Sequence, residues 1–287
     1  MQRIKSFDSP KATLYIVATP IGNLNDISLR AVNTLKSVVR IYAEDTRTSG
    51  TLLKHYEIKT PMQSYHEHNE HEKTEQALEH LRKGESIALI SDAGTPRISD
   101  PGDPLIASVR DHGFAVSPIP GASAVLSALM MARMRTDMFT FVGFLPAKTT
   151  AREKMLHTLA VVNHTLVFYE TPHRITKTLA SMYSVFGERE ATLVREVTKQ
   201  HEEAIDFLLS EHGELDNLRG EMVIVVSGDD TQAPIDALDV LSHIELLLED
   251  GASEKDAIKR AASARGMKKN DVYMQYQTHK KRMQSKE

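Results

Sequence analysis

The stretch ISDAGTPRISDPG (Ile90–Gly102) directly follows the apolar run ESIALI (Glu85–Ile90), whose composition is typical of a buried strand. Two clusters of Gly, Pro and Asp follow each other within its thirteen residues. A simple reversal of the chain needs only one such cluster. The stretch therefore predicts a long loop at the end of a strand, and its shape needs a further explanation.

Strand-like apolar runs alternate with helical patterns along the first half of the chain. We expect strands within residues 13–23, 38–45, 86–92 and 114–123, and helices within residues 26–38, 72–84 and 103–113. Asp26 is the expected cap of the first helix, and Gly84 and Gly113 are the expected ends of the other two. This βαβαβαβ order predicts a mainly parallel sheet with helices on both faces.

Three glycine-bearing loops follow strands of this sheet and should meet at one edge. They are TPIGN (Thr19–Asn23), SDAGTP (Ser91–Pro96) and IPGASA (Ile119–Ala124). Glycine lets backbone groups approach a ligand closely, so a small, flat ligand held largely by backbone contacts is expected. Because no loop has the Walker or the Rossmann fingerprint, nucleoside triphosphates and NAD are disfavoured.

The second half predicts another α/β layer. Strand patterns occupy FTFVGFLPAK (Phe139–Lys148), HTLVFYETPHRI (His164–Ile175), ATLVREVTKQHEE (Ala191–Glu203) and GEMVIVVSG (Gly220–Gly228). We expect the segment GFLP (Gly143–Pro146) to act as the hinge between the two layers. The resulting division is an N-terminal α/β domain (12–135), a C-terminal α/β domain (136–230) and a helical extension (235–284), with a ligand site in the crevice.

Composition narrows the possible functions. The 287 residues carry a formal net charge of −4 and include no Cys, which excludes thiolate nucleophiles and Cys-ligated zinc. No apolar run is long enough to cross a bilayer, and the N-terminal residues lack the apolar region of a signal peptide, so we expect a cytoplasmic protein.

The C-terminal extension is basic, whereas the rest of the chain is acidic. Residues 254–287 hold ten Lys and Arg against four Asp and Glu. The pattern predicts three short helices: an apolar stripe of Leu238, Leu241, Ile244 and Leu248, a second helix capped by Ser253 between stops at Gly251 and Gly266, and a third capped by Asn270. An RNA clamp that uses Lys268 and Lys269 is one interpretation. A solvated charged face, or a helical cap on a dimer, is the other.

The order and spacing of seven strings resemble the tetrapyrrole methylase superfamily. They are YIVATPIGNLNDISLRA, AEDTR, SDAGTPRISDPG, GFLPAK, FYETPHR, VREVTKQHEE and GEMVIVV. The resemblance implies two α/β domains with S-adenosylmethionine between them, usually in a homodimer. Within the superfamily the strings are similar to members that methylate the ribose 2′-oxygen of a cytidine at the decoding site of small-subunit (16S) ribosomal RNA. The implied partner is this RNA, within the assembled 30S subunit.

The resemblance also implies which residues bind the cofactor. They are Pro20, Gly22, Asp92, Gly94, Thr95, Ser123, Ala124, Phe168, Tyr169 and Met222. Residues Ser99 to Gly102 should begin the next helix, with their backbone amides facing the cleft.

Methyl transfer to a ribose hydroxyl benefits from a general base, since a neutral alcohol is a poor nucleophile. The candidates are Glu170, Lys199, Glu196 and Asp45. An ion pair that holds a loop is the alternative role for each of them. Arg47, Arg174 and Lys199 are further expected to contact RNA phosphates, because they are cationic and belong to loops at the cleft edge.

The run YHEHNEHE (Tyr65–Glu72) has ligand types that zinc accepts, including His66 and His68. It leads directly into a helical pattern, and methyl transfer from a sulfonium needs no metal. We expect a polar entry to a helix near the RNA, and no metal site.

Two other functions share parts of this pattern. A methylase that acts on a porphyrinoid would have the same fold and a wide apolar cleft, but no use for the basic extension. A non-catalytic RNA-binding protein would have lost cofactor binding.

Overall fold

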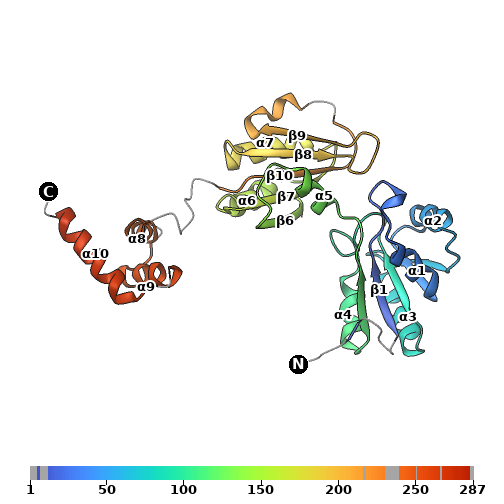
Figure 1. Cartoon of the computed structure of the whole chain (residues 1–287). Helices are drawn as coiled ribbons and strands as arrows, with labels where there is room; N and C mark the ends of the chain where they lie inside the picture. The colour runs from blue at the N-terminus through green and yellow to red at the C-terminus, as the bar shows by residue number, and fades with distance from the viewer. Residues whose placement is uncertain are drawn as a thin grey trace. The chain divides into compact units, whose positions relative to one another are not determined.

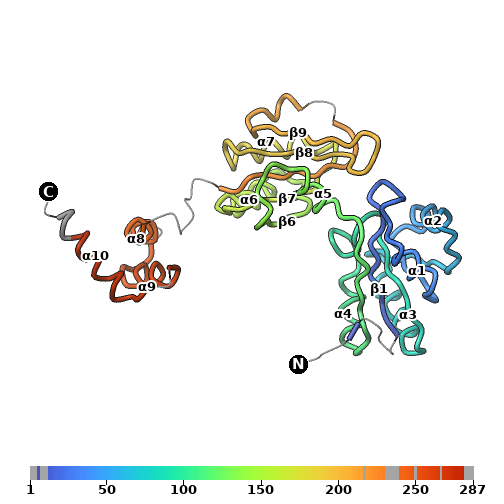
Figure 2. Tube along the Cα trace, in the orientation of Figure 1, coloured from blue at the N-terminus to red at the C-terminus, as the bar shows by residue number. Residues whose placement is uncertain are grey.

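The computed structural model describes residues 5–6, 12–215, 218–229, 239–249, 251–265 and 267–284. The chain divides into two compact units, Met1–Gly228 and Asp229–Glu287. Figure 1 shows that the first unit contains two sheets and the second contains only helices, and Figure 2 follows the same path along the Cα trace.

The first sheet is entirely parallel, with the strand order β3-β2-β4-β1-β5. Its strands are β1 (Thr13–Val17), β2 (Arg40–Ala43), β3 (Met62–Ser64), β4 (Ile87–Ile90) and β5 (Ala115–Ile119). The four strands expected from the sequence are confirmed. The three-residue β3 was missed, because it is too short to show an alternation of apolar and polar residues.

Helices cover both faces of this sheet, as the alternating pattern predicted (Figure 1). One face packs against α3 (Glu70–Arg82) and α4 (Asp103–Asp111), and the other packs against α1 (Leu29–Ser37) and α2 (Thr46–His55). Helix α2 was not expected, since its sequence TRTSGTLLKH is polar apart from two leucines. Both leucines, Leu52 and Leu53, are buried, which removes apolar surface from water and holds the helix in place.

The second sheet is mixed rather than parallel, with the order β6-β7-β10-β8-β9. Its strands are β6 (Phe139–Phe144), β7 (Thr165–Glu170), β8 (Glu190–Arg195), β9 (Glu203–Leu208) and β10 (Met222–Val226). Only β6 and β7 pair in parallel. The short connection between β8 and β9 requires an antiparallel pair, because a parallel return needs a dozen or more residues.

Helices again pack on both sides of the second sheet. Helices α6 (Thr149–Leu159) and α7 (Ile175–Phe186) bury their apolar residues against one face, and α5 (Ala124–Met131) packs on the other face. Two 3₁₀ turns, η1 (Leu24–Asp26) and η2 (Leu209–Glu214), complete the unit.

Three local expectations were wrong. Helix α1 is capped by Ser28, whose Oγ accepts the N–H of Ala31, whereas Asp26 belongs to η1. Helix α4 begins at Asp103 after Gly102, with a proline in its first turn, so Ser99 to Gly102 form the loop that precedes it. The segment 143–146 is not a hinge, because it consists of the last two residues of β6 and the two residues after that strand. The chain reaches β6 from α5 through residues 132–138.

The second unit packs α8 (Val240–Glu249), α9 (Glu254–Ala264) and α10 (Lys269–Gln284) around a small apolar core. Ser253 caps α9 as expected, and Gly251 has a positive φ of 84° before it. Asn270 is not a cap, since α10 already includes Lys269. Leu238 and Gly266 lie outside the described residues. No helix in the described part of the chain is long and apolar enough to span a membrane.

Candidate functional site: a cavity at the carboxyl ends of the first sheet

The three glycine-bearing loops meet at one edge of the first sheet, as expected. Strands β4, β1 and β5 are neighbours, so their carboxyl ends lie side by side. The first two loops are joined by a pair of backbone hydrogen bonds, from Thr19 N to Gly94 O (2.8 Å) and from Gly94 N to Thr19 O (3.2 Å). The Thr95 hydroxyl donates to Ala122 O in the third loop at 3.5 Å.

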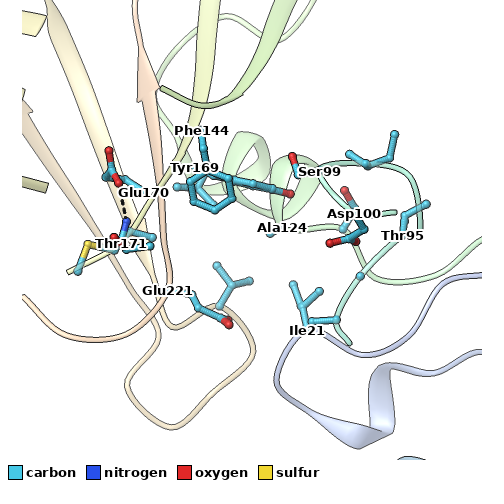
Figure 3. A pocket seen from close by; sticks show the side chains of 17 residues that line it. Ile21, Thr95, Ser99, Asp100, Ala124, Phe144, Tyr169, Glu170, Thr171 and Glu221 are labelled. Atoms are coloured by element: carbon cyan, nitrogen blue, oxygen red, sulfur yellow. Dashed lines mark hydrogen bonds between the residues drawn. The ribbon is translucent and has the colours of Figure 1, made fainter. Parts of the chain in front are cut away.

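A cavity of about 300 Å³ opens between these loops and the second sheet. Figure 3 shows Ile21, Thr95 and Asp100 on one side of it, facing Tyr169 and Glu221 on the other. The side from the first sheet consists of loops, whereas the opposite side uses strand ends of β6, β7 and β10.

Six of the ten expected cofactor residues line this cavity: Gly94, Thr95, Ser123, Ala124, Tyr169 and Met222. Three others, Pro20, Gly22 and Asp92, line an adjoining hollow that shares Ile21, Ala93 and Glu221 with the cavity.

Phe168 is the remaining expected residue, and its side chain does not lie in the cavity. Successive residues of a strand face opposite sides of a sheet, and Phe168 is fully buried in the core under α6 and α7. Its neighbour Tyr169 occupies the cavity face instead.

Backbone strain is concentrated in the loops around the cavity. Arg97 and Ser99 have φ values of 77° and 69°, and Glu196 and Thr198 have values of 49° and 66°. Residues with a Cβ rarely adopt this left-handed region, and such outliers cluster at functional sites. The two strained segments come from loops of different sheets, and the second of them accepts a hydrogen bond from the loop after β1, from Asn23 N to Thr198 Oγ1 (3.1 Å).

The walls suit a ligand that is partly aromatic and partly charged. Ile21, Val197 and Val223 provide apolar surface, and Phe144 and Tyr169 lie with ring centroids 5.5 Å apart. Asp100 and Glu221 provide carboxylates. S-adenosylmethionine, which the resemblance implies, combines a flat adenine with hydroxyl, amino and sulfonium groups, so its chemistry fits these walls.

Glu170, the first candidate base, is engaged in a buried structural contact. Its side chain is fully buried, with Arg174 Nε 3.2 Å from Oε1 and the Thr178 hydroxyl donating to Oε2 at 2.5 Å. The Thr171 N–H also donates to Oε1, which is the dashed line in Figure 3. Both carboxylate oxygens are therefore engaged by neighbouring protein groups.

The other three candidate bases also form ion pairs, and the hydrogen bond from Lys199 lowers the pKa of Glu196. Lys199 donates to Glu196 (3.0 Å) and Glu221 (3.1 Å); burial lowers its pKa, but these hydrogen bonds outweigh burial and the pKa is raised. A lysine held protonated cannot act as a base. Asp45 caps α2 and pairs with Arg47, whose hydrogen bonds lower the pKa of Asp45 to about 2.

The residues that were expected to contact RNA differ in how exposed their side chains are to solvent. Arg47 is 90% exposed despite its pairing with Asp45, and Lys268 and Lys269 are exposed in the second unit. Arg174 is half-buried and donates to Leu145 O as well as pairing with Glu170. Its guanidinium therefore supports the loop after β7.

A second hollow, of about 890 Å³, adjoins the cavity. It is lined by Glu44, His66, Glu67, His68 and Glu70, together with the loop from Arg97 to Pro104. His66 contacts the side chain of Asn69, at the entry to α3. No group of three His, Asp or Glu in the part of the chain that the structure describes is arranged to hold a metal ion.

The carboxyl groups of Asp100 and Glu44, which line this hollow, both have raised pKa values. The pKa of Asp100 is raised to about 6, chiefly by burial and also by the nearby charges of Glu44 and Asp92, against a hydrogen bond from Ser91 that lowers it. Burial and the charge of Asp92 also raise the pKa of Glu44. Asp100 was not expected among the functional carboxylates, although it lies in the loop Ile90–Gly102.

Comparisons with known proteins agree with this geometry. The family described as Tetrapyrrole (Corrin/Porphyrin) Methylases matches residues 13–212. The Ribosomal RNA small subunit methyltransferase I of Bacillus subtilis is 42% identical, covering 96% of this chain and 98% of that protein. The protein of the same name from Haemophilus influenzae is 45% identical, covering 91% and 94%.

Solved structures show the same fold at much lower identity. Uroporphyrin-III C-methyltransferase of Thermus thermophilus, in complex with S-adenosylhomocysteine, superimposes with a TM-score of 0.55 at 18% identity, covering 78% of this chain and all of that one. Diphthine synthase superimposes with a TM-score of 0.59 at 14% identity, covering 76% and 90%.

Proposed function

The chain belongs to the tetrapyrrole (corrin/porphyrin) methylase family, and we propose that it transfers a methyl group from S-adenosylmethionine to a ribose 2′-oxygen of small-subunit ribosomal RNA. The observation that carries the proposal is the 42% identity, over nearly the whole of both chains, to a protein named for methylating this RNA. The 2′-oxygen of a cytidine at the decoding site is the finer part of the proposal, and it follows from the motif resemblance.

The residues of the cavity would hold the cofactor in a fixed orientation. Gly94 adopts a φ of 78°, which keeps the second loop tight against Thr19 and exposes its backbone to the cavity. The apolar residues around Val197 and Val223 would receive the adenine, and Glu221 is placed to accept hydrogen bonds from hydroxyl or amino groups. S-adenosylmethionine supplies an electrophilic methyl group on its sulfonium.

Positioning is the main contribution that the protein can make. Alignment of the hydroxyl with the methyl group at about 3 Å accelerates such a reaction strongly, because two reactants no longer have to find each other. The hydrogen bond between Asn23 and Thr198 links the first loop to the loop after β8, so both sides of the site are held together.

The second unit is proposed to bind the RNA outside the catalytic site. Its helices α9 and α10 carry exposed cations, among them Lys259 and Lys269, and the exposed Lys268 directly precedes α10. Cations that neutralise phosphates release bound counterions, which favours binding without requiring a specific sequence. Residues 254–287 hold ten Lys and Arg against four Asp and Glu, whereas the residues before them are acidic overall, so the end of this unit is where the phosphate backbone would bind most favourably. The assembled 30S subunit is the proposed form of the substrate.

A homodimer is also proposed. On α5, Leu126 is 55% exposed and Met130 is 87% exposed, and they lie four residues apart on one helix face. Burial of this face by a second copy would remove its apolar surface from water. Light scattering of the double variant Leu126→Glu, Met130→Glu tests this: a monomer is expected, and an unchanged dimer would place the interface elsewhere.

A substrate comparison tests the proposed function. Purified protein and S-adenosylmethionine with a labelled methyl group are incubated separately with 30S subunits, protein-free 16S RNA and a porphyrinoid. Label in a cytidine of the 30S subunit, mapped by nuclease digestion and mass spectrometry, is the expected result. Label in the porphyrinoid alone would favour the small-molecule methylase, and cofactor binding with no transfer to any acceptor would contradict catalysis.

A further inference from the structure

Asp100 lies where the cavity and the second hollow meet. Among the residues that line the two spaces, Ser99 and Asp100 are the two that both have in common. Figure 3 shows Asp100 in the cavity wall, with the ring of Tyr169 across from it. A molecule in the cavity and a molecule in the hollow would therefore meet beside this carboxylate.

The neighbours of Asp100 make it an unusually basic carboxylate. Glu44 and Asp92 are the charged groups that act on it, both negative, and the Ser91 hydroxyl is its hydrogen-bond donor. Its pKa is raised to about 6, chiefly by burial. Tyr169 faces it as a neutral phenol, because burial raises the pKa of Tyr169 to about 12. At pH 7 to 8 Asp100 is thus ionised, yet it binds a proton more readily than an exposed aspartate.

The second hollow has the size and the chemistry for a nucleotide. Its volume of about 890 Å³ lies in the range of small-molecule sites. Besides Asp100, its lining has four carboxylates, against one guanidinium from Arg97 and the imidazoles of His66 and His68; the four are those of Glu44, Glu67, Glu70 and Asp103. The excess of carboxylates disfavours phosphates, but carboxylates accept hydrogen bonds from the exocyclic amine of a cytosine. A base and its ribose can therefore enter here while the phosphates remain outside.

We propose that Asp100 is the general base of the reaction and that the target nucleotide occupies the second hollow. This inference rests on the proposed methyl transfer to ribose. The Asp100 carboxylate takes the proton of the 2′-hydroxyl as the oxygen forms its bond to the methyl carbon. The bond between that carbon and sulfur breaks, and its electron pair stays on sulfur, which becomes a neutral thioether. The proton then leaves Asp100 for solvent.

The test compares Asp100→Asn with Asp111→Asn, the same substitution at the exposed far end of α4. Single-turnover methylation of 30S subunits is measured from pH 5 to pH 9. For the wild type and Asp111→Asn, the rate is expected to fall tenfold per pH unit below about pH 6. In Asp100→Asn it should be about 10²- to 10⁴-fold lower at pH 8, without this acid limb. Calorimetry should show wild-type S-adenosylmethionine affinity for Asp111→Asn, and for Asp100→Asn a loss of affinity much smaller than its loss of rate.

Thermal unfolding gives a readout that does not depend on activity. The folded pKa of Asp100 is raised above its unfolded value, so the wild type loses stability as the pH rises from about 4 to about 6. Asp100→Asn avoids burial of this charge, and it should melt at a higher temperature than the wild type at pH 8, with a difference that shrinks towards pH 5. Asp111→Asn should show no such trend.

Different outcomes separate this inference from the proposed function. If the wild type methylates 30S subunits and Asp100→Asn does so within tenfold at pH 8, or with the same acid limb, Asp100 is not the base. If the wild type shows no acid limb, the inference also fails. If the wild type transfers no methyl group to RNA, the proposed function fails, and the role of Asp100 in it fails as well.

Discussion

Gly94→Val should abolish tight cofactor binding without unfolding the protein, and Gly84→Val is a matched control. Both glycines have φ values near 80°, namely 78° and 81°. A Cβ at position 94 would lie 3.4 Å from Cγ2 of Ile21, a cavity residue, whereas a Cβ at position 84 would have nothing within 4 Å. The two substitutions thus share backbone strain and differ in what surrounds the new side chain.

The shared strain sets the effect on stability. A left-handed conformation costs an L-residue about 1–2 kcal/mol, so each variant should lose about this much free energy of unfolding. For a unit of this size, that loss lowers the melting temperature by about 2–8 °C. In Gly94→Val the branched side chain also has to displace Ile21 or the loop itself. Loss of about 1.4 kcal/mol of binding energy already weakens affinity tenfold, and we expect at least that.

Isothermal titration calorimetry with S-adenosylmethionine and thermal unfolding followed by circular dichroism measure the two effects. Gly84→Val should melt lower than the wild type and bind normally. Gly94→Val should melt comparably lower and bind at least about tenfold more weakly. Wild-type affinity in Gly94→Val, or an equal loss of affinity in Gly84→Val, would refute the assignment of this loop to the cofactor site.

Three further predictions follow from particular contacts. Glu170→Ala leaves the half-buried Arg174 without its partner, so urea unfolding should show a loss of about 3–5 kcal/mol; near wild-type stability would contradict a structural role for Glu170. A chain that ends at Gly228 should keep its cofactor affinity in calorimetry and lose methylation of 30S subunits, and unchanged methylation would remove the second unit from RNA binding. In the full-length protein, the affinity for RNA measured by filter binding should fall steeply with added salt, because phosphate contacts release counterions; a flat salt dependence would contradict binding through these cations.

The sequence alone determined the first sheet and its glycine loops. Apolar runs such as Ile87–Ile90 are dictated by burial on both faces, and the helices between them alternate at regular spacing. Since the carboxyl ends of parallel strands share one edge, the common edge of the three loops followed from the pattern of strands and turns. The pairing of Thr19 with Gly94 depends on β1 lying next to β4, which the tertiary structure decided. The boundaries of the three expected domains stay a prediction.

The tertiary structure decided what individual side chains do. Glu170, Lys199 and Asp45 have the chemistry of a base, but contacts with Arg174, Glu221 and Arg47 commit them to structure. The pairing of strands likewise made the second sheet mixed, because β10 is antiparallel to both β7 and β8, and it added a β9 that was not expected.

The role proposed for Asp100 also depends on tertiary contacts. Its residue type and its loop are visible in the sequence, but its raised pKa arises from burial and from Glu44, which is 56 residues away along the chain. The free energy of ionising a carboxylate depends on the solvent and the charges around it. Local sequence sets the backbone of this loop, whereas long-range contacts set that environment.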